Sequence, residues 1–180
     1  MVDAEIVRQI LDYNPDTGEF CWKARTPEMF VAGKHSSQRK CRAWNAKNTG
    51  NIAGTSGGDG YLQISINSRR YQAHRIAWLW MVGEMPRKEI DHIDCDRSNN
   101  RFANLREATH AQNNRNTPKQ SNNSSGYKGV FLDRNLGKWR ARIYVNGDCQ
   151  YLGCFGALED AAAAYAKAAH ELHGEFARTE

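Results

Sequence analysis

Residues 89–100, EIDHIDCDRSNN, place three aspartates around a single histidine, His92, in a chain whose net charge is +5. Carboxylates this close together repel one another unless a cation, a proton or hydrogen-bond donors offset their charge. The apolar neighbours Ile90 and Ile93 indicate a strand whose end delivers Asp91 and His92 into a cleft. The segment is therefore either a hydrogen-bonded polar turn or part of a site for a metal ion.

Two later asparagines favour the metal site. Asn104 follows His92 by twelve residues and Asn113 follows it by twenty-one, with a strand-like segment and a helix start between them. A strand, a loop, a second strand and a helix can bring Asp91 and Asn113 to one hard cation, which prefers oxygen ligands. A carboxylate and an amide oxygen predict Mg²⁺ or Mn²⁺ as the cofactor rather than zinc.

The segment HRIAWLWMVGEMPRKEIDHIDCDRSNNRFANLREATHAQNNRN resembles the HNH endonuclease family, in the branch that contains phage and intron-encoded homing endonucleases. The resemblance covers about residues 60–116 and depends on the Asp-His pair, the Asn-Asn pair, Asn-Leu-Arg and the closing Asn-x-x-Asn. It implies a ββα-metal fold that binds one divalent ion at the scissile phosphate of DNA.

The resemblance also implies roles for single residues. Asp91 and Asn113 would bind the metal, His92 would be the general base, and Asn104 would orient His92 and its loop. Neutral histidine can accept a proton from water at cellular pH, which phosphodiester hydrolysis requires. Many relatives have histidine where this chain has Asn113. The nearby His110 is therefore a candidate for a supporting role just outside the metal ligands.

Other residues of the loop have lesser expected roles. Asp94 and Asp96 are expected to form turns or to lie just outside the ligand shell, and Asn99 and Asn100 to satisfy backbone groups of the loop. Cys95 stands where a glycine is common in the family, which bears on the geometry of this turn.

Patterns elsewhere predict the elements that position these residues. Apolar spacing predicts a helix in AEIVRQILDY, a hairpin in GYLQISI and RYQAHR, and a helix in RIAWLWMVG that ends near Gly83. LREA predicts a short strand, and Thr109 with Gln112 forms a capping box that starts a helix. Residues 31–58 are basic, rich in Gly, Ser and Asn, and are interpreted as a long loop.

The C-terminal part predicts a second domain. YKGVFL, KWRARIYV and CQYLGCF are strand-like, and residues 158–174 form an alanine-rich helix. We therefore expect an α+β protein with a nuclease domain and its N-terminal helix and hairpin in 1–116, a linker in 117–126, and a three-stranded antiparallel sheet packed on one helix in 127–180.

The segment SGYKGVFLDRNLGKWRARIYVNGDCQYLGCFGALEDAAAAYAKAAHELHG resembles the plant ethylene-response-factor (APETALA-type) DNA-binding domain, which implies a sheet that lies in the major groove. Alternation in the second strand turns Trp139, Ala141 and Ile143 toward the helix. Phe131 and Asp133 replace frequent arginines. The residues expected on the DNA-facing side are Lys128, Arg134, Arg140, Arg142, Tyr144 and Tyr151.

Charge is unevenly distributed along the chain. Residues 31–75 carry eight Lys or Arg against one Asp or Glu, and residues 115–155 carry seven against two. Two basic blocks with interleaved aromatics indicate a nucleic-acid partner, although basic residues also serve as solvated surface. Arg75 is a candidate phosphate contact, and His74 either joins it or packs in the core.

Composition excludes some classes of protein. The five cysteines are scattered without a C-x-x-C pair, which indicates free thiols. No apolar run approaches the roughly 20 residues of a membrane span, and the N-terminus does not look like a secretory signal. We expect a cytoplasmic protein, in the host cytoplasm if a bacteriophage encodes it, that is a monomer or weak dimer.

The favoured function is a metal-dependent endonuclease that a C-terminal sheet directs to double-stranded DNA. One alternative is a non-catalytic, sequence-specific DNA-binding regulator that uses the sheet alone. Another is a structure-specific or RNA-directed nuclease. The intact Asp91-His92 pair favours an enzyme, because a regulator has no need to keep it.

Overall fold

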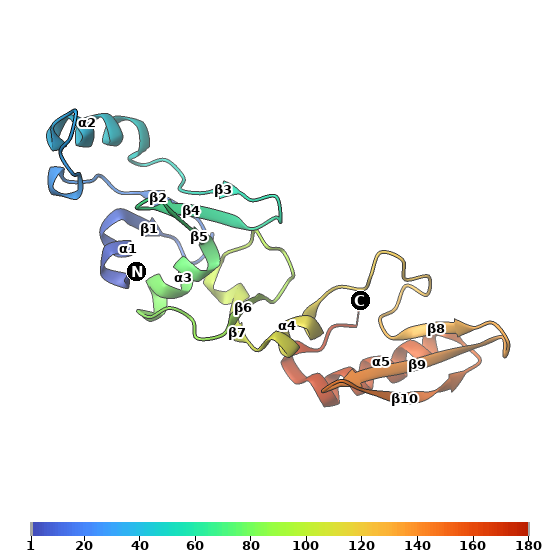
Figure 1. Cartoon of the computed structure of the whole chain (residues 1–180). Helices are drawn as coiled ribbons and strands as arrows, with labels where there is room; N and C mark the ends of the chain where they lie inside the picture. Colours follow the sequence, from blue (N-terminus) through green and yellow to red (C-terminus); the bar gives the residue numbers. More distant parts are fainter. Residues whose placement is uncertain (1, 180) are drawn as a thin grey trace. The chain divides into compact units, whose positions relative to one another are not determined.

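A computed structural model describes residues 2–179 of the chain, which forms two compact units divided between Glu107 and Ala108. The described residues contain five α-helices and several small antiparallel sheets, so the expected mixture of helices and strands is confirmed (Figure 1). Residues 117–126, the predicted linker, contain no helix or strand and lie within the second unit.

The first unit begins with a helix followed by two short strands, and its further elements alternate between helices and hairpins. In chain order these elements are α1 (Ala4–Ile10), β1 (Leu11–Tyr13), β2 (Phe20–Trp22), η1 (Pro27–Met29), α2 (Ser37–Asn48), β3 (Thr55–Ser56), β4 (Leu62–Ile66), β5 (Arg69–Gln72), α3 (Ala73–Val82), β6 (Glu89–His92), η2 (Phe102–Asn104) and β7 (Leu105–Ala108).

Apolar alternation and helical spacing build one core in this unit. Ile64 and Ile66 of β4 are buried, and they belong to the same cluster as Ile76 and Leu79 of α3. Helix α3 ends at Gly83, whose φ of +92° is left-handed and whose N–H bonds the carbonyl of Leu79. The predicted hairpin and the predicted helix are both confirmed.

The prediction of a loop over residues 31–58 was wrong, because this segment contains α2. The Ser36 side chain caps the helix by accepting a hydrogen bond from the Arg39 N–H at 3.3 Å. Cys41 is the only buried residue of α2. A helix that is polar on nearly all sides has no apolar stripe, so hydrophobic periodicity could not reveal it.

The β1–β2 turn supports the loop that follows β6. Gly18 has a φ of +78°, and a Cβ built there would lie 2.5 Å from the Arg101 nitrogen and 2.6 Å from the Asn100 carbonyl carbon. The Tyr13 hydroxyl donates to the Asn100 carbonyl at 2.6 Å. The N-terminal hairpin therefore packs directly against residues 100 and 101.

The second unit contains the predicted sheet and helix. Its elements are α4 (His110–Asn116), β8 (Val130–Asp133), β9 (Lys138–Val145), β10 (Asp148–Phe155), α5 (Leu158–His173) and η3 (Gly174–Phe176), and the strand order in the sheet is β10-β9-β8. Ala141 and Ile143 are buried in one cluster with Ala161 and Tyr165 of α5. The predicted direction of the β9 side chains is thus confirmed.

Replacing Gly18 by alanine should destabilise the first unit strongly. Left-handed strain costs an alanine about 1–2 kcal/mol, and the backbone clash adds about 1–3 kcal/mol. Gly50→Ala is the matched control, because Gly50 has a φ of +80° but no atom within 4 Å of its added Cβ. Urea unfolding followed by tryptophan fluorescence should show a clearly larger loss for Gly18→Ala, and equal losses would contradict the contact.

Candidate active site

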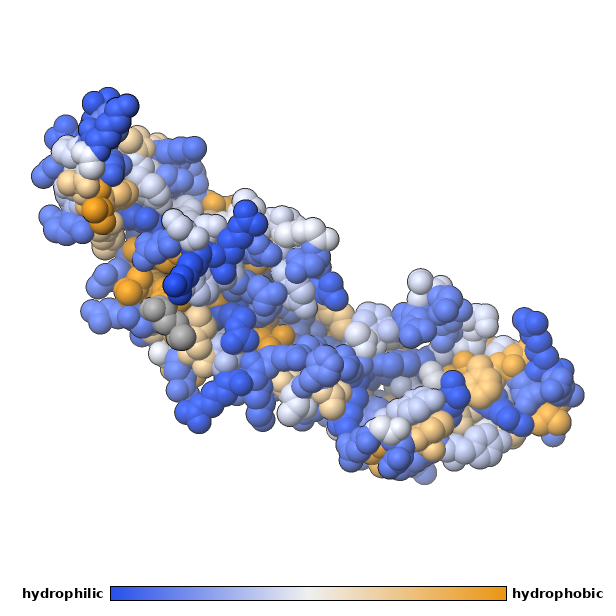
Figure 2. Space-filling view, viewed as in Figure 1, coloured by the Kyte–Doolittle hydropathy of each residue, from blue (hydrophilic) through white to orange (hydrophobic). Residues whose placement is uncertain are grey.

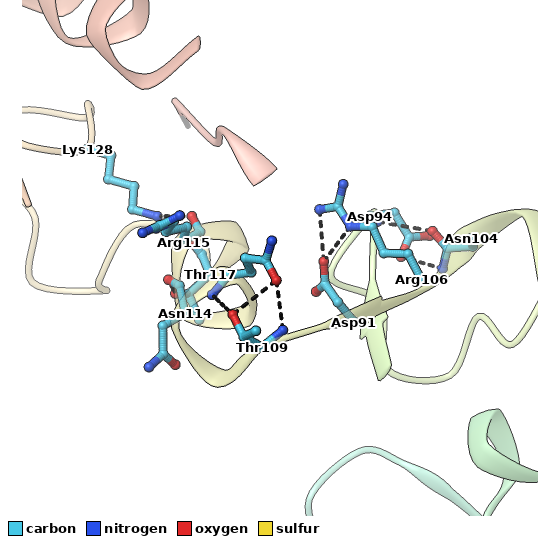
Figure 3. A network of polar contacts seen from close by, with 10 residues as sticks. Asp91, Asp94, Asn104, Arg106, Thr109, Asn114, Arg115, Thr117 and Lys128 are labelled. Atoms are coloured by element: carbon cyan, nitrogen blue, oxygen red, sulfur yellow. Dashed lines mark hydrogen bonds and ion pairs between the residues drawn. The ribbon is translucent and has the colours of Figure 1, made fainter. Parts of the chain in front are cut away.

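Asp91 and His92 end strand β6, and both are buried, with 4% of each residue exposed. Asp91 Oδ2 accepts hydrogen bonds from Nε and Nη2 of Arg106, each at 2.8 Å (Figure 3). Arg106 lies on β7, which pairs with β6. The guanidinium offsets the cost of removing the carboxylate from water, and the paired strands hold the two groups in register.

The other two aspartates of the loop have donors of their own. Asp94 accepts hydrogen bonds from the side-chain amides of Asn99 at 2.6 Å and Asn104 at 2.9 Å. Asp96 accepts from the N–H and hydroxyl of Ser98 at 2.9 and 2.6 Å. Burial acts to raise the pKa of Asp94, but these amides together with the Asp96 N–H and the nearby His92 hold the pKa below its ordinary value. The crowded acids are therefore compensated by an arginine and by neutral donors.

Asn104 fixes the loop through both its side chain and its backbone. Its Oδ1 accepts from the Asp94 N–H at 3.1 Å, its Nδ2 donates to the Asn99 carbonyl at 2.9 Å, and its carbonyl accepts from the Ile93 N–H. Cys95 has a φ of +65°, the left-handed conformation in which glycine is favoured. The loop thus adopts a glycine-type turn with a cysteine in it.

Asn100 contacts the His92 ring directly, a role that sequence reasoning missed. His92 Nε2 lies 3.3 Å from Asn100 Oδ1, and Asn100 Nδ2 donates to the Ser98 carbonyl at 3.1 Å. The second bond orients the amide so that Oδ1 faces the ring, an arrangement that fits the tautomer with its proton on Nε2. Asn100 is 1% exposed, which a pair of adjacent asparagines in a polar loop did not indicate.

His74 and Tyr61 flank this ring. The His74 and His92 rings meet edge to face at a centroid distance of 5.0 Å, and the Tyr61 ring lies 5.2 Å from His74 and 5.9 Å from His92. His74 is 4% exposed, and its Nδ1 has no hydrogen-bond partner. Of the two expectations for His74, the packed histidine is the one observed.

Both imidazoles are held in the neutral form. Burial lowers the pKa of His74 from 6.5 to about 3, and repulsion from Arg75, and from His92 whenever that ring is protonated, acts in the same direction. Burial also lowers the pKa of His92, although the Asn100 contact and the carboxylates of the loop partly oppose it. A neutral imidazole is the form that can accept a proton from water.

Asn113 and His110 lie on α4 and are described with the second unit. The Thr109–Gln112 capping box is present, with the Thr109 N–H donating to Gln112 Oε1 at 2.8 Å, so the predicted helix start is confirmed. Asn113 is partly exposed and His110 is exposed. Residues 2–179 contain no group of three or more His, Cys, Asp or Glu side chains that could hold a metal ion.

The face of the C-terminal sheet that points away from α5 combines aromatic and basic side chains. The Arg142 guanidinium lies 4.9 Å from the Phe131 ring and 5.6 Å from the Tyr144 ring, and Tyr151 pairs with Arg142 across the strands. Tyr144 is 54% exposed and Tyr151 62% exposed. This face is therefore accessible to a large ligand.

The other four basic residues that are expected to contact DNA have different surroundings. Arg140 forms an ion pair with Asp133 at 2.8 Å. Lys128 donates to the carbonyls of Arg115 and Thr117 at 2.7 Å, as Figure 3 shows for Arg115. Arg134 is exposed in the β8–β9 turn, whereas Arg75 donates to the carbonyls of Pro86 and Lys88.

Comparison with known proteins identifies relatives of this chain. Residues 71–115 match the HNH endonuclease family. Protein 3.8 of Escherichia phage T7 is 33% identical over 119 residues, which make up 66% of this chain and 95% of the phage protein. An uncharacterized HNH endonuclease of Acanthamoeba polyphaga mimivirus is 35% identical over 124 residues, which make up 67% of this chain and 63% of that protein. No solved structure matches.

Within residues 2–179, no helix has both the length and the apolar character that crossing a membrane requires.

The buried His74 predicts a loss of stability in mild acid. Its pKa is lower in the folded than in the unfolded chain, so the unfolded state binds more protons as pH falls below 6.5 toward 3. At pH 5 this difference amounts to about 2 kcal/mol, and it is absent above the unfolded pKa. Unfolding in urea at pH 5 and pH 7.5 should therefore show a smaller pH dependence in His74→Gln than in the parent.

His35→Gln is the control, because His35 is exposed, and its pH dependence should match that of the parent. If the free energy of unfolding of His74→Gln depends on pH as strongly as that of the parent, the His74 ring is solvated and the prediction is wrong.

Proposed function

Because this chain belongs to the HNH endonuclease family and is a nuclease, we propose that it is a metal-dependent endonuclease that hydrolyses phosphodiester bonds of double-stranded DNA. The observation that carries this proposal is the buried Asp91-His92 pair at the end of β6, with the ring oriented by Asn100. A regulator without catalytic activity has no use for a buried carboxylate next to an oriented neutral base.

The donor set fits a hard divalent ion such as Mg²⁺ or Mn²⁺. Asp91 supplies a buried carboxylate at the end of β6. Asn113, predicted from its spacing, would supply an amide oxygen in a ββα-metal arrangement. Magnesium is commonly bound by one or two protein ligands together with water and substrate phosphates, so a large cluster of acidic residues is not required. When bound, the ion would stabilise the charge that develops on the leaving oxygen.

The residues of the chain have separable roles in this proposal. His92 takes a proton from the attacking water at Nδ1, because Asn100 holds the other nitrogen in its protonated form. Asn104 keeps Asp94 and the loop in place. Asp94 and His110 are proposed to act outside the ligand shell, Asp94 through the loop and His110 beside Asn113.

The second unit is proposed to direct the enzyme to DNA. Its three-stranded sheet packed on one helix supports an ethylene-response-factor-like domain, and the exposed Arg142, Tyr144 and Tyr151 suit phosphate and base contacts. Arg140, which alternates onto the same side of β9 as Arg142, and also Lys128 and Arg134 are proposed to contact DNA with this face. The phage and viral origin of the two relatives supports a role inside an infected host cell.

Strand cleavage should depend on His92 and on a divalent ion. On supercoiled plasmid with magnesium, His92→Ala should nick at least about 100-fold more slowly, which is the usual cost of losing a general base. EDTA should stop the parent enzyme. His170→Ala, at an exposed position of α5, should retain the parent rate. If His92→Ala nicks at the parent rate, His92 is not the base, and if the parent leaves the plasmid intact the regulator becomes the better interpretation.

Removing a cation from the sheet face should weaken DNA binding without slowing the chemical step. Arg142→Ala should raise the Kd for duplex DNA several-fold. It should also make the slope of log Kd against log salt concentration shallower by roughly 0.9, the contribution of one phosphate contact. The cleavage rate at saturating DNA should stay unchanged. Lys167→Ala, on the exposed face of α5, is the control, and equal effects of both variants would contradict the assignment.

A further inference from the structure

Helix α2 presents a basic face, and it contacts η1, where Glu28 lies. Residues 29–58 contain five Lys or Arg and no Asp or Glu. The exposed positions of α2 include Arg39, Arg42, Ala43, Ala46 and Lys47, which fall on one face at helical spacing. The alanines leave the backbone accessible between the cations. Where Figure 1 places α2, Figure 2 shows strongly hydrophilic residues beside some hydrophobic ones.

The opposite face of α2 is fixed by an aromatic cage around Arg25. The Arg25 guanidinium lies 4.0 Å from the Trp44 ring and 5.2 Å from the Trp22 ring, and the two tryptophans meet edge to face at 5.5 Å. Asn45 accepts from the Arg25 N–H and donates to its carbonyl, both at 2.8 Å. These contacts attach one face of α2 to Trp22 and Arg25 and leave the basic face turned away from them.

Stabilising the fold does not explain this helix. Among the described residues of the first unit, the hydrophobic core contains none from α2, and Cys41 is the only buried residue of the helix. In Figure 1 the helix stands apart from α1 and α3 of the same unit. A helix that buries little and concentrates positive charge is typical of a surface that binds a polyanion.

We propose that α2 docks into the major groove of the substrate duplex, with Arg39, Arg42 and Lys47 on the phosphates that border the groove. This inference rests on the proposed endonuclease function and adds to it a second DNA contact, within the same unit as Asp91 and His92. A helix of 12 residues is about 18 Å long and fits a groove about 12 Å wide. The small side chains of Ala43 and Ala46 permit close approach to the bases.

Duplex DNA suits this helix better than duplex RNA. The major groove of A-form RNA is deep and narrow, and an α-helix with its side chains cannot enter it. The basic face of α2 should therefore contribute to binding of B-form DNA and contribute much less to binding of an RNA duplex of the same sequence.

The test measures binding of full-length protein to a DNA duplex in EDTA, across a range of salt concentrations. The variant Arg39→Ala/Arg42→Ala/Lys47→Ala should bind at least tenfold more weakly, with a logarithmic salt slope reduced by roughly 2–3, because each lost phosphate contact contributes about 0.9. With an RNA duplex, the same variant should lose less than threefold. An equal loss on RNA would overturn the groove assignment.

A pair of single substitutions adds a second test, in which the sign of the charge changes on one helix face. Ala46→Glu places a carboxylate on the proposed DNA face of α2, and Ala163→Glu makes the same change on the exposed face of α5. The first should weaken DNA binding about tenfold and the second less than twofold. If the parent binds and cleaves DNA but both α2 variants bind with parental affinity and salt slope, α2 is not a DNA contact and the endonuclease proposal still stands.

Discussion

The organisation of the first unit depends on compensating three carboxylates that follow one another in the chain. Asp91 is buried and must be paired, and its partner Arg106 is one strand away on β7. A carboxylate removed from water without such a partner would favour the protonated form or prevent folding. The β6–β7 pairing is thus required by electrostatics as much as by backbone hydrogen bonds, and it sets the position of the loop between the strands.

Amide side chains complete this arrangement without adding charge. Asn99, Asn100 and Asn104 each accept or donate within the loop, and together they bond Asp94, the loop backbone and the His92 ring. Neutral donors therefore satisfy Asp94 without adding positive charge to the loop.

The N-terminal hairpin supports the same loop from outside. Gly18 approaches the backbone of Asn100 and Arg101, and the Tyr13 hydroxyl bonds the Asn100 carbonyl. Asn100 therefore contacts the hairpin through its backbone and His92 through its side chain. This double contact connects a turn near the N-terminus with the proposed catalytic base more than seventy residues later.

The sequence by itself determined the elements whose patterns are local. Period-two and helical spacing identified β4, β9 and α3, and the capping residues located the start of α4, because these signals depend on near neighbours in the chain. Spacing and family resemblance also singled out Asp91, His92 and Asn104, which the structure places in one strand and its loop.

Only the tertiary structure decided which groups meet. The pairing of Asp91 with Arg106, the contact of Asn100 with His92 and the packing of His74 against His92 join residues that no sequence period relates. The sequence pattern did not predict helix α2, because Trp22 and Arg25, the residues that contact its Trp44, lie outside the helix. Long-range packing selects partners by shape and charge in three dimensions, and a pattern along the chain carries no direct record of that choice.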